Sequence, residues 1–265
     1  MNKVETYYDA HVEAEWTRLS RNKLEFGTTC RVLARFLPRG ARVLDVGGGP
    51  GRYSFHLAAA GYAVTLYDLS AGNIEFARRH ALEAGVDLEG AIQGNVLDLG
   101  ARGLGAFDAV LCMGPLYHLL GESERVRAVE ACLSVLRPGG ILVAAFISCF
   151  APLLETMRNR MPEFVKERDV NLGFLGDGHL VLPPGSGFTD AFLIRPDAIS
   201  PFMARFPIQE LLVTAAEGLP SQTERAIYEQ GEEALETALD IIEWTGTDSL
   251  TWGASDHFLY VGRKR

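Results

Sequence analysis

Residues 43–51 read Val43-Leu44-Asp45-Val46-Gly47-Gly48-Gly49-Pro50-Gly51, an apolar run that ends in a loop of glycines. The residues that follow, 52–60, have the pattern of a helix. Glycines at such a place let a ligand approach the backbone, and the N-terminus of the next helix offers unpaired N–H groups. The stretch therefore predicts a strand, a ligand-binding loop and a helix in succession.

Strand and helix patterns alternate on both sides of this loop. The predicted strands are residues 41–46, 63–67, 88–93, 107–113, 141–147, 208–215 and 257–262, and the predicted helices between the first five of them are 52–60, 70–84 and 123–136. A turn at 137–140 precedes the fifth strand. Such alternation indicates an α/β fold with a parallel sheet and right-handed crossovers. The fully apolar fifth strand fits a sheet that is covered on both faces.

Two segments lie outside this alternating core. Residues 1–40 read as an N-terminal helical cap, and residues 150–206 as an insertion after the fifth strand. Within the insertion, residues 150–168 have a helical pattern, whereas 170–190 are rich in Gly and Pro and are expected to be irregular. Long irregular segments of this kind often form lids. We expect one domain over residues 1–265.

Composition excludes several classes of protein. The chain has 265 residues, 48% of them hydrophobic, and a formal net charge of −9, so it can bury a large core and lacks the basic character of a nucleic-acid-binding protein. We find no apolar stretch of membrane-spanning length and no secretory signal. A cytoplasmic protein without membrane partner is expected, and a homodimer stays an open alternative.

Cysteine and histidine patterns give no metal site. Cys30, Cys112, Cys132 and Cys149 are far apart in the sequence, and none has the C-x-x-C spacing. The six histidines do not cluster along the chain. Free thiols in a reducing compartment and no bound metal are the expectation.

The acidic residues near the loop discriminate between two cofactor classes. A dinucleotide motif needs a third glycine, but Arg52 or Ser54 occupies that position here. Asp45 would face the ammonium group of S-adenosylmethionine and would repel a pyrophosphate. Asp68 ends the second strand, where a carboxylate can accept hydrogen bonds from both ribose hydroxyls of either cofactor. The pattern favours S-adenosylmethionine over NAD.

Five motifs in this order resemble the class I methyltransferase family. They are residues 43–51, 67–70, 94–99, 107–112 and the turn 136–140, and together they span about residues 40–147. The resemblance implies a Rossmann-like, mostly parallel seven-stranded sheet with helices on both faces, a lid insertion after strand five, and S-adenosylmethionine as cofactor. The implied cofactor-binding residues are Tyr8, Arg18, Asp45, Gly47, Gly49, Gly51, Asp68, Leu69, Asn95, Val96, Cys112 and Met113. Asn95 stands where the family usually has an acid, but its side-chain oxygen can accept from the adenine amine.

A narrower resemblance comes from the loop after the fourth strand. Gly114-Pro115-Leu116-Tyr117-His118-Leu119, together with Tyr8 and Arg18, is similar to a bacterial group of small-molecule methyltransferases. This resemblance implies that Tyr8 folds a helix over the cofactor and that Arg18 pairs with the cofactor carboxylate. The loop also lacks the Pro-Pro-aromatic sequence of enzymes that methylate nucleobase amines, which favours a small-molecule acceptor.

In methyl transfer, the protein itself forms no covalent bond with the substrate. The acceptor atom has to be aligned at about 3 Å from the methyl carbon with water excluded, and a base is needed only for an acceptor such as a hydroxyl. Tyr117 and His118 are the candidate catalytic residues, with a hydrogen-bonded structural role as the alternative for His118. His179 in the insertion is a further candidate base.

Several interpretations stay open at this stage. The aromatic residues Phe174, Phe188, Phe192, Phe202 and Phe206 either pack the insertion onto the domain or line an apolar acceptor pocket. The cations Arg158, Arg160, Lys166 and Arg168 are expected on a solvated helix face. An NAD-dependent oxidoreductase and a non-catalytic S-adenosylmethionine-binding protein are the alternative functions.

Overall fold

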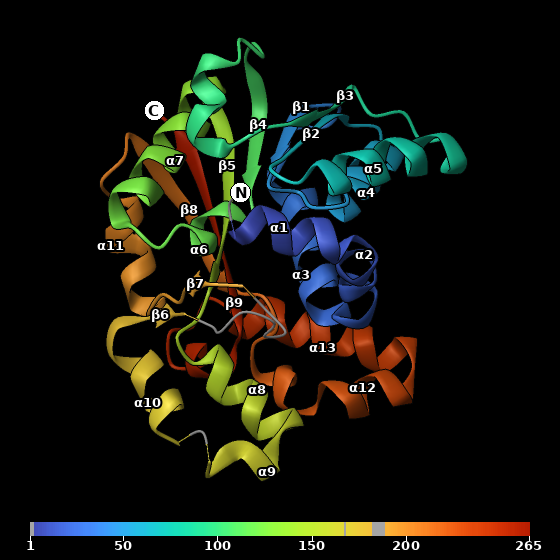
Figure 1. The fold of residues 1–265 in the computed structure, drawn as a ribbon. Coiled ribbons are helices and arrows are strands. Elements are labelled where there is room, and N and C mark those ends of the chain that lie inside the picture. Colours follow the sequence, from blue (N-terminus) through green and yellow to red (C-terminus); the bar gives the residue numbers. More distant parts are fainter. Residues whose placement is uncertain (1–2, 167, 182–188) are drawn as a thin grey trace.

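A seven-stranded sheet forms the centre of the computed structural model, which describes residues 3–166, 168–181 and 189–265 (Figure 1). The strand order is β3-β2-β1-β4-β5-β9-β8; β3, β2, β1, β4 and β5 are parallel, and β9 is antiparallel to both its neighbours. The strands are β1 (Arg42–Val46), β2 (Ala63–Asp68), β3 (Gly90–Gln93), β4 (Phe107–Cys112), β5 (Leu136–Ile147), β8 (Ile208–Ala215) and β9 (His257–Lys264). The prediction of a mostly parallel, seven-stranded α/β sheet is confirmed.

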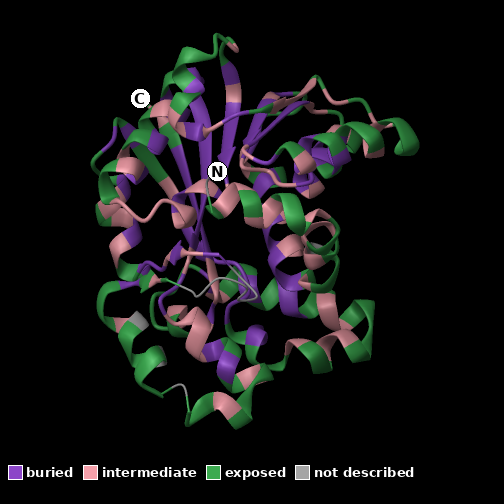
Figure 2. Cartoon of the chain, in the orientation of Figure 1, coloured by how far each residue is buried: buried purple, intermediate pink, exposed green. Residues whose placement is uncertain are grey.

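Helices cover both faces of the sheet because successive strand residues point to opposite sides. Leu44, Val110 and Phe258 belong to one buried cluster, and their neighbours Val43, Leu111 and Leu259 belong to the other. The strands are accordingly buried along most of their length (Figure 2). The covering helices include α3 (Lys23–Phe36), α4 (Arg52–Ala59), α5 (Ala71–Ala84), α7 (Glu122–Val135), α11 (Ile199–Met203) and α13 (Glu232–Thr245).

Short elements complete the two ends of the chain and the loops. They are α1 (Lys3–Ala10), α2 (Val12–Arg21), the 3₁₀ helix η1 (Val96–Ala101), α6 (Pro115–His118), η2 (Pro196–Ala198), η3 (Leu219–Thr223), α12 (Glu224–Gln230) and η4 (Trp252–Ala254). The helices α1 and α2 lie over the end of the sheet where the glycine loop is found (Figure 1). Among the described residues, no helix is long and apolar enough to cross a membrane.

The turn expected at residues 137–140 is part of β5 and not a separate connection. Leu136 pairs with Phe107 and pairing resumes between Ile141 and Ala109, so four residues of β5 stand opposite a single residue of β4. Gly139 supplies the left-handed backbone, with φ +74°, that such a bulge requires. The strand is therefore longer than its apolar stretch.

The segment 150–206 contains more regular structure than its composition suggests. It holds α8 (Ala151–Asn159), α9 (Met161–Phe164), α10 (Arg168–Asp177), the strand pair β6 (His179–Leu180) and β7 (Ala191–Phe192), and then η2 and α11. The expectation of irregular structure over 170–177 is wrong. A glycine costs a helix only about 1 kcal/mol, and contacts of α10 with α8 offset the cost of Gly173 and Gly176.

The aromatic residues of this segment fall into different environments. Phe202 and Phe206 pack into the main core, with ring centres 5.6 Å apart, which supports the packing interpretation for these two. The guanidinium of Arg125 lies 3.5 Å from the ring centre of Phe192. The side chain of Phe174 and the whole of Phe188 lie outside the described part of the chain.

Candidate cofactor and acceptor site

A cavity of about 980 Å³ opens at the C-terminal ends of the parallel strands, where open α/β sheets bind ligands. Ten of the predicted cofactor-binding residues line it, namely Tyr8, Arg18, Asp45, Gly47, Gly49, Asp68, Leu69, Asn95, Val96 and Met113. The candidate catalytic residues Tyr117 and His118 line the same cavity. The structure thus brings together residues that the motifs place more than 100 positions apart.

Two predicted cofactor residues are not in the cavity wall. Gly51 is the N-cap of α4, with φ +96°, and its Cα faces Phe55 and Leu66. Cys112 is 1% exposed and lies in the main core. Direct cofactor contact is therefore not supported for either residue; Gly51 shapes the loop, and Cys112 packs behind it.

The glycine loop is packed too tightly for side chains. A Cβ added to Gly48 would lie 2.5 Å from Oδ2 of Asp45 and 2.5 Å from Cδ1 of Leu66. Gly47 has a left-handed backbone, and a Cβ there would lie 2.6 Å from Cδ of Pro115. The backbone of the loop can therefore approach a ligand directly, as the sequence predicts.

Asp45, at the end of β1, holds a buried oxygen atom that lacks a partner. Its Oδ2 accepts a hydrogen bond from Oγ of Ser54 at 2.7 Å, whereas no partner is found for Oδ1 among the described residues. Burial raises the pKa of this carboxyl to about 6. Because an unsatisfied buried acceptor is costly, the site fits a ligand that brings a cationic donor, such as the ammonium group of S-adenosylmethionine.

Asp68, at the end of β2, is tied to the backbone around it. Its Oδ2 accepts from N of Gly49 at 2.8 Å, and its Oδ1 accepts from N of Ser70 at 2.9 Å and from Nδ2 of Asn73 at 3.1 Å. Burial raises the pKa of this carboxyl. A carboxylate has about four accepting positions, so one remains for a ribose hydroxyl. Ser70 caps α5, as predicted, by accepting from N of Asn73 at 3.0 Å.

Asn95 has a structural role that the sequence does not reveal. Its Oδ1 accepts from N of Leu97 at 2.9 Å and so caps η1. This bond orients the side chain at the cavity wall beside Val96. The contact with adenine stays a prediction.

His118 joins three separate segments. Its Nε2 lies 2.7 Å from the Tyr8 hydroxyl on α1, and its Nδ1 lies 3.4 Å from the carbonyl oxygen of Asp190. Burial lowers the pKa of the imidazole to about 4. With both nitrogens engaged and the ring neutral at pH 7, the geometry favours a positioning role, and the catalytic role of His118 stays a prediction.

Tyr117 is held against the loop after β4. Its hydroxyl donates to the carbonyl oxygen of Met113 at 2.9 Å, and burial raises the pKa of the phenol. This bond fixes the ring in the cavity wall beside Met113. A contact with the acceptor stays a prediction.

Arg18 reaches the cavity but already has acidic partners on its own chain. Its Nη1 donates to Oε2 of Glu25 at 2.8 Å, and its Nε lies 3.3 Å from Oε2 of Glu15. A guanidinium has five N–H donors, so Arg18 keeps donors for a further carboxylate. The contact with the cofactor carboxylate stays a prediction.

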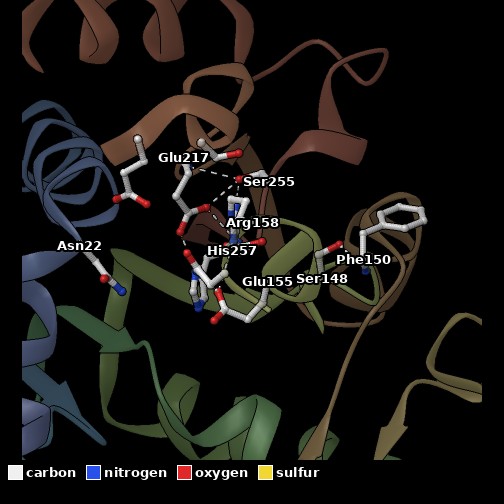
Figure 3. A network of polar contacts seen from close by, with 12 residues as sticks. Asn22, Ser148, Phe150, Glu155, Arg158, Glu217, Ser255 and His257 are labelled. Carbon is white, nitrogen blue, oxygen red and sulfur yellow. Dashed lines mark hydrogen bonds and ion pairs between the residues drawn. The ribbon is translucent and has the colours of Figure 1, made fainter. Parts of the chain in front are cut away.

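A second polar cluster at the far end of the cavity was missed by the sequence analysis. His257 begins β9 and pairs with Ile147, the last residue of β5, which brings it to the ligand edge of the sheet. Its Nδ1 lies 2.6 Å from Oε1 of Glu217, and Oε2 of Glu217 accepts from Oγ of Ser255 at 2.7 Å. In Figure 3, His257, Glu217 and Ser255 lie side by side, with Asn22 and Glu155 approaching from other elements.

Burial lowers the pKa of His257. The carboxylates of Glu217 and Glu25 raise it by more than burial lowers it, so that the pKa is about 9. Glu25 lies 192 positions before Glu217, and Glu217 lies 40 positions before His257, so the three residues form no recognisable sequence motif. Only the position of His257 at the start of a strand hinted at this role. The sequence motifs assign no role to His257, and its contact with Glu217 is a property of the fold.

The four cations expected on one solvated helix face differ in their environment. Arg158 on α8 binds the carboxylate of Asp256 and its side chain is 14% exposed, so the expectation is wrong for Arg158. Arg160, which lines the cavity, and Lys166 and Arg168 are exposed as expected. His179 is exposed, lies near Asp177 and does not line the cavity.

Glu25, Glu217 and His257 have the composition of a metal site, with one ligand atom of each within 4.8 Å of the others. Two carboxylates and an imidazole are common ligands of divalent cations. Here, however, Arg18 binds Glu25 and His257 binds Glu217. Two cationic groups thus already compensate the two carboxylates, and we interpret the cluster as an ion-pair network.

Comparison with known proteins agrees with this geometry. Residues 43–140 match the family model described as a methyltransferase domain. The chain contains a methyltransferase domain. The match covers β1 to the bulge of β5 and includes the glycine loop and Asp68.

Several relatives in sequence and in structure are named methyltransferases. The ubiquinone biosynthesis O-methyltransferase of Xanthomonas axonopodis pv. citri (strain 306) is 46% identical over 111 residues, which are 42% of this chain and 45% of that protein. The chain thus matches less than half the length of this relative.

Among solved structures, a SAM-dependent methyltransferase from Methanosarcina mazei has a TM-score of 0.58 at 17% identity, covering 88% of this chain and 96% of that chain. Magnesium protoporphyrin IX methyltransferase from Synechocystis PCC 6803, solved with bound SAH, has a TM-score of 0.57 at 16% identity, covering 99% and 98%. These similarities show the fold. Both neighbours are methyltransferases, one described as SAM-dependent and the other solved with bound SAH. The narrower similarity to one bacterial small-molecule group stays a prediction.

Proposed function

We propose that this protein transfers a methyl group from S-adenosylmethionine to a hydroxyl oxygen of a small molecule. The observation that carries the proposal is the cavity lined by the glycine loop, Asp68 and Asp45, whose buried Oδ1 has no partner among the described residues. A hydroxyl acceptor is favoured over a nitrogen because the curated relatives that match residues of this domain are named O-methyltransferases.

Three residues would bind different parts of the cofactor. Asp45 would accept a hydrogen bond from the ammonium group, Asp68 would accept one from a ribose hydroxyl, and Asn95 would accept one from the adenine amine. When bound, the cofactor supplies a methyl group that is already activated for transfer. The chain's own contribution is to orient the acceptor oxygen towards that methyl group and to exclude water. Tyr117, Ala151, Leu180 and Leu193 line the cavity and support this role.

The acceptor is proposed to be a small amphiphilic molecule. Apolar side chains of Val4, Ile147, Leu180 and Leu193 line the cavity beside the polar cluster of His257. A net charge of −9 gives an unfavourable long-range field for a polyanion. We therefore propose no nucleic-acid or membrane partner and a cytoplasmic location, and keep a homodimer as a hypothesis.

Two other functions use the same cavity. An NAD-dependent oxidoreductase would place a pyrophosphate near the buried carboxyl of Asp45, which disfavours it. A non-catalytic S-adenosylmethionine-binding protein would bind the cofactor without turnover. Only a transfer assay separates this second alternative from the proposal.

The test is transfer of a radiolabelled methyl group from S-adenosylmethionine into a metabolite extract, bulk RNA and a protein lysate. We expect label in the metabolite fraction, lost in Asp45→Asn and retained in Asp87→Asn, a matched change at an exposed loop residue. Label found only in RNA or protein would contradict the small-molecule proposal. Binding of the cofactor without any label transfer would support the non-catalytic alternative.

A further inference from the structure

We propose that His257, oriented by Glu217, is the residue that takes the proton from the acceptor hydroxyl, and that the polar end of the cavity is the acceptor site. This inference rests on the proposed function and assigns a chemical role to residues outside the methyltransferase motifs. Neither residue lies within the segment 43–140 that matches the family model.

The position of His257 suits contact with an acceptor. Its pairing with Ile147 places it at the C-terminal end of β5, on the same edge as the loop after β4 that carries Met113 and Tyr117. All four residues line one continuous cavity. The proposal requires the same acceptor oxygen to lie within hydrogen-bond reach of Nε2 of His257 and to face the loop after β4, and one cavity joins these two places.

The ring of His257 has one nitrogen anchored and one available. Nδ1 lies 2.6 Å from Oε1 of Glu217, and no hydrogen-bond partner is found for Nε2 within residues 3–166, 168–181 and 189–265. The side chain is 23% exposed, in the cavity wall. A histidine whose one nitrogen binds a carboxylate presents the other nitrogen in a fixed orientation and protonation state.

Glu217 is itself held in place by three donors. Besides the imidazole, it accepts from Oγ of Ser255 at 2.7 Å and from the backbone N of His257 at 3.0 Å. The residue is 5% exposed. A buried carboxylate with fixed partners is a rigid support for the ring, so Glu217 is a positioning residue.

The charged groups around His257 come from every neighbouring element. Glu217, Glu25 on α3 and Arg18 on α2 act on His257 directly. Asp256, which precedes β9, is paired with Arg158 on α8. Glu224, at the start of α12, interacts with Glu217. Of these groups, Glu217 and Glu25 raise the pKa of His257 to about 9, against its burial and against Arg18. The raised pKa favours the imidazolium that a proton acceptor has to become.

The step balances within these groups. In the reactive arrangement one proton lies between Nε2 and the acceptor oxygen, because binding of a hydroxyl to the imidazolium releases one proton to solvent. As the oxygen forms its bond to the methyl carbon, the carbon–sulfur bond breaks and its electron pair stays on sulfur. The proton then ends on Nε2, and the imidazolium is paired with Glu217.

His118 is less suited to this step. Burial lowers its pKa to about 4, and both of its nitrogens already face oxygen atoms of Tyr8 and Asp190. The pH dependence of the two histidines therefore differs. A base with the pKa of His257 gives a pH profile that rises near pH 9, whereas a base with the pKa of His118 gives one that rises near pH 4 and is flat at neutral pH.

The first experiment follows 4-nitrocatechol, a phenol whose ionisation is visible by absorbance, bound to the complex of the protein with S-adenosylhomocysteine. We expect the bound phenol of the wild type to ionise about one pH unit lower than in His257→Gln, because an imidazolium favours the phenolate. The control His56→Gln changes an exposed histidine on α4 and should match the wild type.

The second experiment measures the titration of His257 by NMR. Glu217→Gln should lower its pKa by at least one unit and halve or abolish the effect on 4-nitrocatechol, with circular dichroism unchanged. A purely structural Glu217 would leave both titrations where they are. These readouts need no turnover.

Three outcomes would overturn the proposal. They are equal ionisation of 4-nitrocatechol in the wild type and His257→Gln, no binding of 4-nitrocatechol to the S-adenosylhomocysteine complex, and loss of transfer activity upon chelation of divalent metals. If S-adenosylhomocysteine itself does not bind, the proposed function fails. If it binds and the phenol is unaffected, only the role of His257 fails.

Discussion

The Tyr8 hydroxyl and Nε2 of His118 lie 2.7 Å apart, although 110 residues separate them in the sequence. The contact joins α1 to the short helix after β4, and both residues line the cavity. Trp16 on α2 adds a second contact of the N-terminal segment, 5.9 Å between ring centres from Phe55 on α4. The N-terminal helices are thus attached to the cofactor-binding half of the sheet at several points.

Tyr8→Phe should weaken cofactor binding without unfolding the protein. The change leaves a buried imidazole nitrogen without its partner, at a cost of about 1–2 kcal/mol, or roughly 5–30-fold in the Kd of S-adenosylhomocysteine. Calorimetry measures this directly. Tyr62→Phe, on the strand-connecting loop outside the cavity, is the control; equal affinities for all three proteins would show that α1 does not hold the cofactor.

His118→Ala separates the two roles of that histidine. As a positioning residue, it should raise the Kd of S-adenosylhomocysteine and lower kcat only mildly. As a general base for a hydroxyl acceptor, its loss should lower kcat by about 10²–10⁴ with little change in cofactor affinity. We expect the first pattern. The second would restore His118 as the catalytic base.

Asp45→Asn should have opposite effects on stability and on binding. Burial raises the folded-state pKa of Asp45 to about 6, above its ordinary value of 3.8, so its contribution to stability is present at low pH and is lost as the pH rises through 6. The ligand-free variant should therefore melt at a higher temperature than the wild type at pH 8, with a smaller difference at pH 5.

The same variant should lose most of the increase in Tm that S-adenosylmethionine gives the wild type. In the wild type, cofactor affinity should fall as the pH drops below about 6, because the carboxylate that receives the ammonium group becomes protonated. Thermal melts with and without cofactor at both pH values measure all of this. A variant that is stabilised equally well by the cofactor would contradict the role of Asp45.

Asp68→Ala should weaken cofactor binding by roughly 1.5–3 kcal/mol, the scale of a charge-assisted hydrogen bond. Part of the loss comes from the loop, since Oδ2 of Asp68 also accepts from N of Gly49. Calorimetry with S-adenosylhomocysteine gives the value, and circular dichroism checks the fold. Wild-type affinity in this variant would remove Asp68 from the site.

Residues 150–194 are predicted to act as a lid. Proteases should cut near residues 173–187. Of this range, residues 182–187 lie outside the part of the chain that the structure describes. Cofactor together with an acceptor should slow the cutting, because Ala151, Glu155 and Leu180 line the cavity. Cleavage at the same rate with and without ligands would argue against closure.

The sequence was most informative where function depends on backbone geometry. Gly47 and Gly49 have left-handed φ values, and Asp45 and Asp68 stand at strand ends, so local spacing alone placed them correctly. The same motifs included Gly51 and Cys112, which do not line the cavity, because a motif gives the position of a residue along the chain but not the direction of its side chain.

The acceptor end could not be predicted, for a physical reason. His257, Glu217 and Glu25 are brought together by the antiparallel strand β9, the loop after β8 and α3, and their pairing is a property of the tertiary fold. Helix α10 was missed because glycine lowers local helix propensity by only about 1 kcal/mol, which contacts with α8 override.

The central claim is that the cavity at the end of β1 and β2 is built for S-adenosylmethionine. The most direct measurement is calorimetric titration of the protein with S-adenosylhomocysteine and, separately, with NAD. We predict micromolar binding of S-adenosylhomocysteine with one site per chain and no detectable binding of NAD. Tighter binding of NAD, or no binding of S-adenosylhomocysteine, would contradict the account.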